Sequence, residues 1–346
     1  MEYCMKKLFT SPKSVAFIAL AAVLVVMTGL FSGAGVGDFW SLANIVKMLL
    51  AASLAYMLVF WNYSATEHYG LFRRGVQIFV FLAALGSLLV IMLSPSLANI
   101  LVREDNYLEN LEAVFLFAAS AVSLLVALRF ARLKDTRRAV VALFFFVLFF
   151  LIGMEEISWM QRIFHDQSGA FFQAHNQQDE TNLHNMDTGL SEDAYYFGAF
   201  AFLVLVPFFR DKFAAFFKKK NWSFLTTFLP SAWFFIPFAL MAGFVAPYSY
   251  QESTILLGFF GSVAILLYEI DRTAKLRAYA GLAVRMACLL LLIATGLWLT
   301  FHDAVLEAMR AGAPKEYMEN LISFGMFVYA VDLYFRNFAR GLKQGR

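Results

Sequence analysis

Residues 139–156 read AVVALFFFVLFFLIGMEE, a run of sixteen uncharged and mostly apolar residues that ends at Glu155 and Glu156. A helix needs about 20 mostly apolar residues to cross the hydrocarbon core of a bilayer. Together with the residues that flank it, the run is long enough for one crossing. It therefore predicts a transmembrane helix whose far end carries two adjacent carboxylates.

The whole chain has the composition of a protein with many such helices. Of its 346 residues, 61% are hydrophobic and 15% are charged, whereas a typical soluble domain is about 45–50% apolar and about 25% charged. We predict an all-α fold, a polytopic transmembrane helical bundle of about ten spans that forms one integral membrane domain over residues 1–346. The sixth span is short, and Ser191 is its expected N-cap. The expected spans are 15–31, 40–61, 75–94, 109–130, 138–159, 194–209, 224–246, 252–270, 280–301 and 315–335.

Basic residues alternate along the connections between these spans. They gather at 6–13, 73–74, 132–138, 210–220, 272–277 and 336–346. The other connections carry only Arg103, Arg162, Arg310 and Lys315. Because Lys and Arg concentrate in cytoplasmic loops, we predict that both termini are cytoplasmic and that the polar loop 160–193 is periplasmic.

Charge and cysteine content exclude two further classes. The net charge is +3 and the basic residues form only small clusters, so the sequence has no nucleic-acid-binding footprint. The two cysteines, Cys4 and Cys288, are far apart in the sequence. They indicate neither a disulfide framework nor a thiolate metal site.

Three predicted helices that run inward begin with the same pattern, Tyr-x-Glu. The pattern occurs at Tyr107–Glu109, Tyr250–Glu252 and Tyr317–Glu319. One interpretation is local, because Tyr favours the membrane interface and Glu favours a helix N-terminus. The other is functional: the glutamates form an acidic ring around an outward-facing cavity.

The richest polar segment is 154–187, at the outer end of the opening stretch. If its helix continues through Phe164, then Glu155, Ser158 and Arg162 share one face. An ionisable group at membrane depth normally turns toward a partner or a cavity. We therefore take Glu155, Glu156 and Arg162 as candidate catalytic residues.

His184 adds an imidazole to the same segment. It follows Glu180 by four residues, so on a helix the two side chains can bind one metal ion or form an acid–imidazole pair. Glu180 and His184 are thus a candidate site for a divalent metal, with zinc, iron or manganese suited to these ligands. Alternatively, they cap helices and fasten the loop by hydrogen bonds. The sequence indicates no other cofactor.

Lys47 and Arg285 lie several residues inside predicted spans. Lys47 either extends its ammonium group outward to the interface or pairs with Glu112 or Glu155. Arg285 is near the cytoplasmic end of its span, and we expect its side chain to reach that interface.

The run Gly153–Arg162, followed by Asn176–Asn185, resembles a pattern found in a group of bacterial polytopic membrane proteins with no assigned activity. Their pattern reads Gly-Glu-Glu-Ile-Ser-Trp-Gly-Gln-Arg, then Asn-x-Gln-x-Glu-x-Asn-Leu-His-Asn. This chain has Met154 and Met160 where the pattern has glycines. The likeness covers about a tenth of the chain. It implies a multi-pass protein of the bacterial inner membrane and no particular reaction.

Three functions fit these features. The first is a membrane enzyme acting on a lipid or lipid-linked substrate, with Glu155 or Glu156 as general acid/base, His184 as a second acid/base or metal ligand, and Arg162 as an anion contact. The second is a transporter or channel with an acidic outer vestibule. The third is a non-catalytic subunit that docks a partner membrane protein through the loop 160–193. For all three functions we expect membrane lipids as partners and no nucleic acid.

Overall fold

The computed structural model describes residues 67–102, 107–160, 168–169, 188–245, 253–276, 279–302, 309 and 313–339. Within these ranges the regular structure is helical and no strand occurs, which confirms the predicted all-α class for this part of the chain. Five of its helical stretches are long and apolar enough to cross a membrane, as in an integral membrane protein. They are Gly70–Leu93, Tyr107–Arg132, Thr136–Glu156, Ser223–Gly243 and Gly281–Phe301. The total of ten spans and their orientation stay predictions, and spans 15–31 and 40–61 lie outside the described residues.

The chain divides into two compact units, residues 1–79 and 80–346. The structure describes only the start of α4 (Glu67–Leu93) in the first unit, and this helix continues into the second. The short α5 (Pro95–Leu101) follows, with Ser94 as its N-cap. The packing described below lies within the second unit. A single domain over 1–346 stays a prediction.

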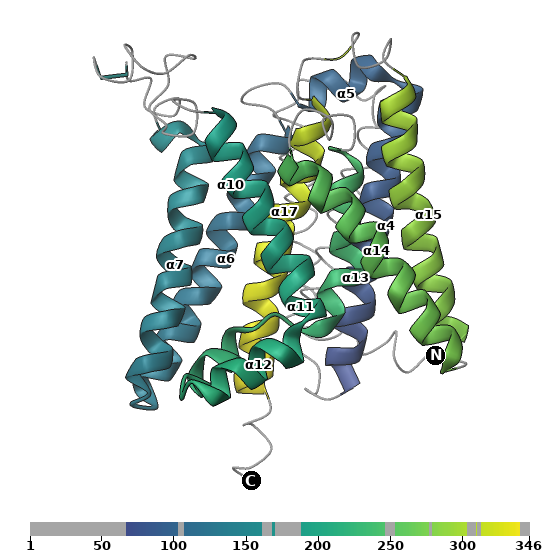
Figure 1. Ribbon diagram of the computed structural model, residues 1–346. Coiled ribbons are helices and arrows are strands. Elements are labelled where there is room, and N and C mark those ends of the chain that lie inside the picture. Colours follow the sequence, from purple (N-terminus) through teal and green to yellow (C-terminus); the bar gives the residue numbers. More distant parts are fainter. Residues whose placement is uncertain are drawn as a thin grey trace, which may run out of the picture. The chain divides into compact units, whose positions relative to one another are not determined.

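The helices α6 (Tyr107–Arg132) and α7 (Thr136–Glu156) form an antiparallel hairpin (Figure 1). Asp135 caps α7, because its carboxylate accepts hydrogen bonds from the Arg138 backbone N–H (3.2 Å) and from Arg138 Nη1 (2.6 Å). At the other end of α7, Gly153 allows close packing: a Cβ there would lie 3.2 Å from Leu116 Cβ. The opening stretch of the sequence therefore forms a helix, as predicted, and α6 packs against it.

The helix α17 (Ala313–Tyr334), which continues as the π-helical η8 (Phe335–Ala339), is the central element of this unit. It packs along α6, and α10 crosses in front of it in Figure 1. Between Leu321 and Leu333 every residue except Phe327 is buried. A helix enclosed on all sides belongs to the interior of a bundle, so polar groups on α17 must find their partners within the protein.

The predicted span 224–246 is interrupted, and residues 223–243 form a chain of short helical turns. These are η4 (Ser223–Phe228), η5 (Ala232–Phe234), α13 (Phe235–Phe238) and η6 (Ala239–Gly243). Pro230 and Pro237 have no backbone N–H to donate, which prevents an unbroken helix. Irregular backbone at membrane depth requires protein around it, and this segment is largely buried.

Polar side chains of α17 and η8 satisfy that irregular backbone. The Tyr329 hydroxyl donates to the Phe228 carbonyl (2.8 Å), and Arg336 Nη1 donates to the Thr227 carbonyl (3.4 Å). The buried Asp332 carboxylate accepts from Ser231 Oγ and from Arg336 Nε, both at 2.8 Å. The end of α17 thus anchors the interrupted segment.

The helix α10 (Thr188–Phe200) continues through a π-helical turn, η3 (Ala201–Leu205), into α11 (Val206–Phe208). It begins before its apolar run, as predicted, but Ser191 lies inside the helix. The predicted N-cap at Ser191 is therefore wrong. The helix α12 (Arg210–Lys219) follows and has no buried residue. Its mixture of Phe and Lys side chains is typical of a helix that lies in the membrane interface.

The helices α14 (Ser253–Lys275) and α15 (Tyr279–Phe301) pack together and share a buried carboxylate. Glu269 is 2% exposed and pairs with Arg272 (3.1 Å) and Arg285 (3.5 Å). Arg285 also donates to the Gly281 carbonyl at 3.0 Å. The extension of Arg285 to the interface stays a prediction, and the structure gives its guanidinium a buried acidic partner.

Candidate functional site

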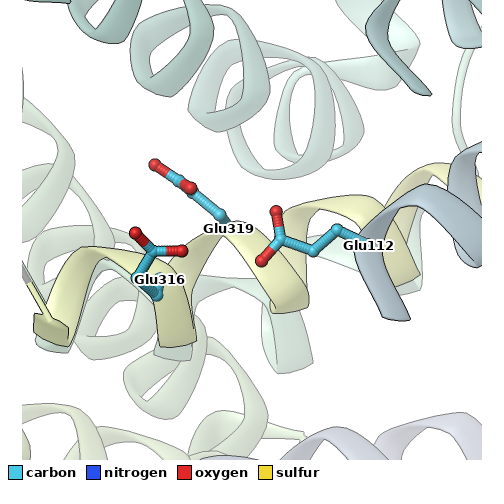
Figure 2. A group of neighbouring side chains, drawn as sticks. All are labelled: Glu112, Glu316 and Glu319. Atoms are coloured by element: carbon cyan, nitrogen blue, oxygen red, sulfur yellow. The ribbon is translucent and has the colours of Figure 1, made fainter. Parts of the chain in front are cut away.

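Three carboxylates from two helices converge in the second unit. Glu112 comes from α6, and Glu316 and Glu319 come from α17. One carboxylate oxygen of each lies within 4.8 Å of those of the other two. Figure 2 shows the Glu112 carboxylate extending toward the α17 helix that bears the other two. We call these three residues the Glu cluster.

Helix geometry explains how the Glu cluster forms. Glu316 and Glu319 are three residues apart, so they share one face of α17 near its beginning. Glu112 lies near the beginning of α6, which packs along α17. Helix N-termini attract negative charge, but Glu112 is completely buried. Burying several carboxylates together is costly unless protons or cations lie among them.

Neighbouring side chains fix the orientation of the carboxylates. Asn320 Nδ2 donates to Glu112 Oε1, and it also donates to the Glu316 carbonyl at 3.2 Å. The Tyr196 hydroxyl, from α10, donates to Glu319 Oε1. Two buried oxygens of this network, Glu112 Oε2 and Asn320 Oδ1, accept no hydrogen bond from the part of the chain that the structure describes.

A second layer of contacts ties α10 to α17 beside the Glu cluster. Lys315 forms an ion pair with Glu192, and its ammonium lies 5.9 Å from the centre of the Tyr196 ring. The Tyr195 hydroxyl lies 3.3 Å from Ser323 Oγ. Three helices therefore contribute to one polar region.

The two glutamates predicted as catalytic are the last two residues of α7. Glu156 is partly exposed and interacts electrostatically with all three members of the Glu cluster. Glu155 instead accepts a hydrogen bond from Trp159 Nε1 at 2.6 Å. The structure thus brings Glu156 to the cluster and gives Glu155 a partner on its own segment.

The helix does not continue through Phe164, which corrects one premise of the sequence interpretation. It ends at Glu156, and a single 3-10 turn, η2 (Ser158–Met160), follows. Ser158 and Trp159 have φ values of 46° and 54°, in the left-handed region that a regular helix excludes. Glu155 and Ser158 therefore do not share the face of one regular helix.

The remaining predicted site residues lie outside the described residues. They are Arg162, Glu180 and His184, with most of the loop 160–193. The candidate metal pair Glu180–His184 and the anion contact at Arg162 stay predictions. Lys47, considered as a partner of Glu112 or Glu155, also lies outside the described residues.

Sequence reasoning found part of the Glu cluster and missed the rest. The repeated Tyr-x-Glu pattern indicated Glu109 and Glu319, and Glu109 contributes to the electrostatic field at Glu112. Glu316 was missed, although Glu-x-x-Glu occurs both at 109–112 and at 316–319. Tyr196 and Asn320 carry no recognisable motif, and only the packing of the helices reveals their role.

No family model, no curated protein and no solved structure matches this chain. Its function must therefore be argued from the site itself. The Glu cluster offers oxygen ligands only, which suit hard cations. Carboxylates beside tyrosine hydroxyls can also exchange protons with a substrate.

Proposed function

We propose that this chain is an integral membrane enzyme that acts on a lipid or lipid-linked substrate, with Glu156 as its general acid/base. The observation that carries the proposal is the convergence of Glu112, Glu316 and Glu319 from α6 and α17, to which Glu156 at the end of α7 is linked electrostatically. The sequence offers Glu155 or Glu156 for this role. The packing of α6, α7 and α17 then supplies a group of ionisable side chains around Glu156, as acid–base chemistry requires.

The rest of the proposal follows from the charge pattern of the sequence. The basic connections support a location of the Glu cluster on the periplasmic side of a bacterial inner membrane. A substrate that stays anchored in the bilayer can present its head group at that depth. Arg162 serves as the contact for an anionic group, and His184 as the second acid/base. Glu155, bonded to Trp159, is the less suitable proton carrier of the two adjacent glutamates.

Lipid extracts test this function while the substrate is still unidentified. Membranes from cells that overproduce the wild type, Glu156→Gln or Asp271→Asn are compared by mass spectrometry. Asp271 is an exposed carboxylate that pairs with Lys275, so Asp271→Asn is a matched control. We expect at least one lipid species to change with the wild type and with Asp271→Asn, and to return to the background level with Glu156→Gln. Identical extracts from wild type and Glu156→Gln, at equal protein abundance, contradict the proposal.

The second candidate, a cation transporter, is favoured by the interrupted segment 223–243. Discontinuous helices near the membrane midplane form ion sites in many transporters, and this segment packs against the same helix, α17, that carries Glu316 and Glu319. Reconstituted vesicles discriminate between the two functions. Cation flux that Glu319→Gln abolishes, with no change in any lipid, favours the transporter. The third function, docking through the loop 160–193, stays a prediction.

A further inference from the structure

We propose that the Glu cluster binds one divalent cation of the hard class, Mg²⁺, Mn²⁺ or Ca²⁺, and that the side-chain carbonyl of Asn320 is a fourth ligand. The site differs from the Glu180–His184 pair predicted from sequence. The part that the ion plays in catalysis rests on the proposed function. Its binding does not, because the ligands and their geometry stand on their own.

The spacing of the carboxylates suits a single ion. Oxygen ligands lie about 2.1 Å from Mg²⁺ and about 2.4 Å from Ca²⁺. Two oxygens on opposite sides of one ion are therefore about 4.2 to 4.8 Å apart. The oxygens of Glu112, Glu316 and Glu319 lie within 4.8 Å of one another. An ion can bind all three with only small rotations of the side chains.

Two buried oxygens provide an observation independent of the clustering. Glu112 Oε2 and Asn320 Oδ1 accept no hydrogen bond within the described ranges, although neither atom reaches solvent. The whole Glu112 side chain is 0% exposed, and its other oxygen accepts from the Asn320 amide. A buried acceptor without a partner is costly. A cation bound beside Glu112 satisfies its Oε2, and Asn320 Oδ1 is available as a further oxygen ligand.

The surrounding contacts hold the ligands in place. Asn320 Nδ2 donates to Glu112 Oε1, and the Tyr196 hydroxyl donates to Glu319 Oε1. Hydrogen bonds from an outer shell orient metal-binding carboxylates and increase affinity.

The ligand set limits which ions suit the site. All four proposed ligands are oxygens of carboxylates or an amide. Such ligands favour magnesium, calcium and manganese, whereas zinc and copper prefer imidazole and thiolate. Manganese is the most useful probe among the three, because its paramagnetism reports binding directly.

The test titrates the purified full-length chain in detergent with MnCl₂ and follows free Mn²⁺ by electron paramagnetic resonance. We expect saturable binding of about one equivalent, with competition by CaCl₂ or MgCl₂. Glu112→Gln keeps the shape of the side chain and removes its charge, so it should weaken binding at least about tenfold, as the loss of an outer-shell contact alone does. Asn320→Leu should also weaken it, and Asp271→Asn should bind as the wild type does.

Thermal unfolding gives a second readout, because each protein is compared with itself in the presence and absence of Mn²⁺. At one Mn²⁺ concentration, the unfolding temperature of the wild type and of Asp271→Asn should rise more than that of Glu112→Gln or Asn320→Leu. The absence of saturable binding in the wild type, or equal affinity in Glu112→Gln, overturns the metal site. A bound ion without any effect of Glu156→Gln on lipids overturns the enzyme and leaves the site. A lipid change that depends on Glu156, without ion binding, overturns the metal site and leaves the proposed enzyme.

Discussion

Glu112 on α6 and Asn320 on α17 are 208 positions apart in the sequence, and the Asn320 amide donates a hydrogen bond to Glu112 Oε1. The bond joins the two helices near their beginnings. Glu112 is fully buried, so water cannot replace the donor. Close packing of α6 and α17 at this end therefore depends on a polar contact inside an apolar interface, where an unpaired group is costly.

The Glu112–Asn320 pair should show strong energetic coupling. Asn320→Leu leaves a buried carboxylate without its donor, and we expect the free energy of unfolding to fall by about 1–3 kcal/mol. Glu112→Met should cost a similar amount. The double variant removes both polar groups and should be less destabilised than the sum of the two single variants. Unfolding in mixed micelles, followed by circular dichroism without added metal, measures all four free energies. Additive effects would show that the two side chains do not interact.

A second prediction concerns the interrupted segment. The Tyr329 hydroxyl donates to the Phe228 carbonyl at 2.8 Å, at the point where η4 ends. Tyr329→Phe removes only this hydroxyl and should lower the free energy of unfolding by about 0.5–1.5 kcal/mol. Tyr279→Phe is the control, because Tyr279 is 74% exposed, and it should change stability little. If both variants unfold at the same denaturant concentration, the hydrogen bond from Tyr329 to the Phe228 carbonyl does not stabilise the fold.

Composition was enough to predict the class of this protein. Long apolar stretches predict membrane helices. The position of Glu156 at the end of such a stretch predicted that its carboxylate turns toward a polar partner or a cavity. The end of α7 could not be predicted in the same way. Ser158 and Trp159 adopt left-handed backbone conformations, which neither residue favours by itself. Such a turn is imposed by its surroundings.

The partners of Glu112 were equally hidden. A contact between positions 112 and 320 depends on which helices become neighbours, and a single sequence carries no record of that choice. The interrupted segment had a visible signal in Pro230 and Pro237. Its apolar composition nevertheless equals that of a regular span, because buried irregular backbone needs apolar side chains just as a lipid-facing helix does.

The packing of α17 against α10–η3 and α13 should be sensitive to the size of residue 325. A Cβ at Gly325 would lie 2.7 Å from Leu203 Cδ1 and 3.0 Å from Phe238 Cε1. We expect Gly325→Ala to lower the free energy of unfolding by about 1–3 kcal/mol through overpacking. Gly198→Ala is the matched helical control, since its Cβ meets nothing within 4 Å. The same denaturation measurement applies. In a Leu203→Ala background, Gly325→Ala should lower the free energy of unfolding by less than it does in the wild type. An equal loss in both backgrounds argues against a direct clash.

The last prediction concerns the orientation of the chain in the membrane. Gly169 is exposed, lies in the loop 160–193 and has open space around a Cβ, so Gly169→Cys offers a reactive thiol. Ser168 is only 5% exposed and is a poorer position. Lys220, exposed at the end of α12, belongs to a basic connection that should face the cytoplasm. In a background with Cys4→Ser and Cys288→Ala, an impermeant thiol reagent added to intact spheroplasts should label Gly169→Cys only. Lys220→Cys should react after the membrane is ruptured. The reverse pattern would place the Glu cluster on the cytoplasmic side and turn the proposed substrate head group toward the cell interior.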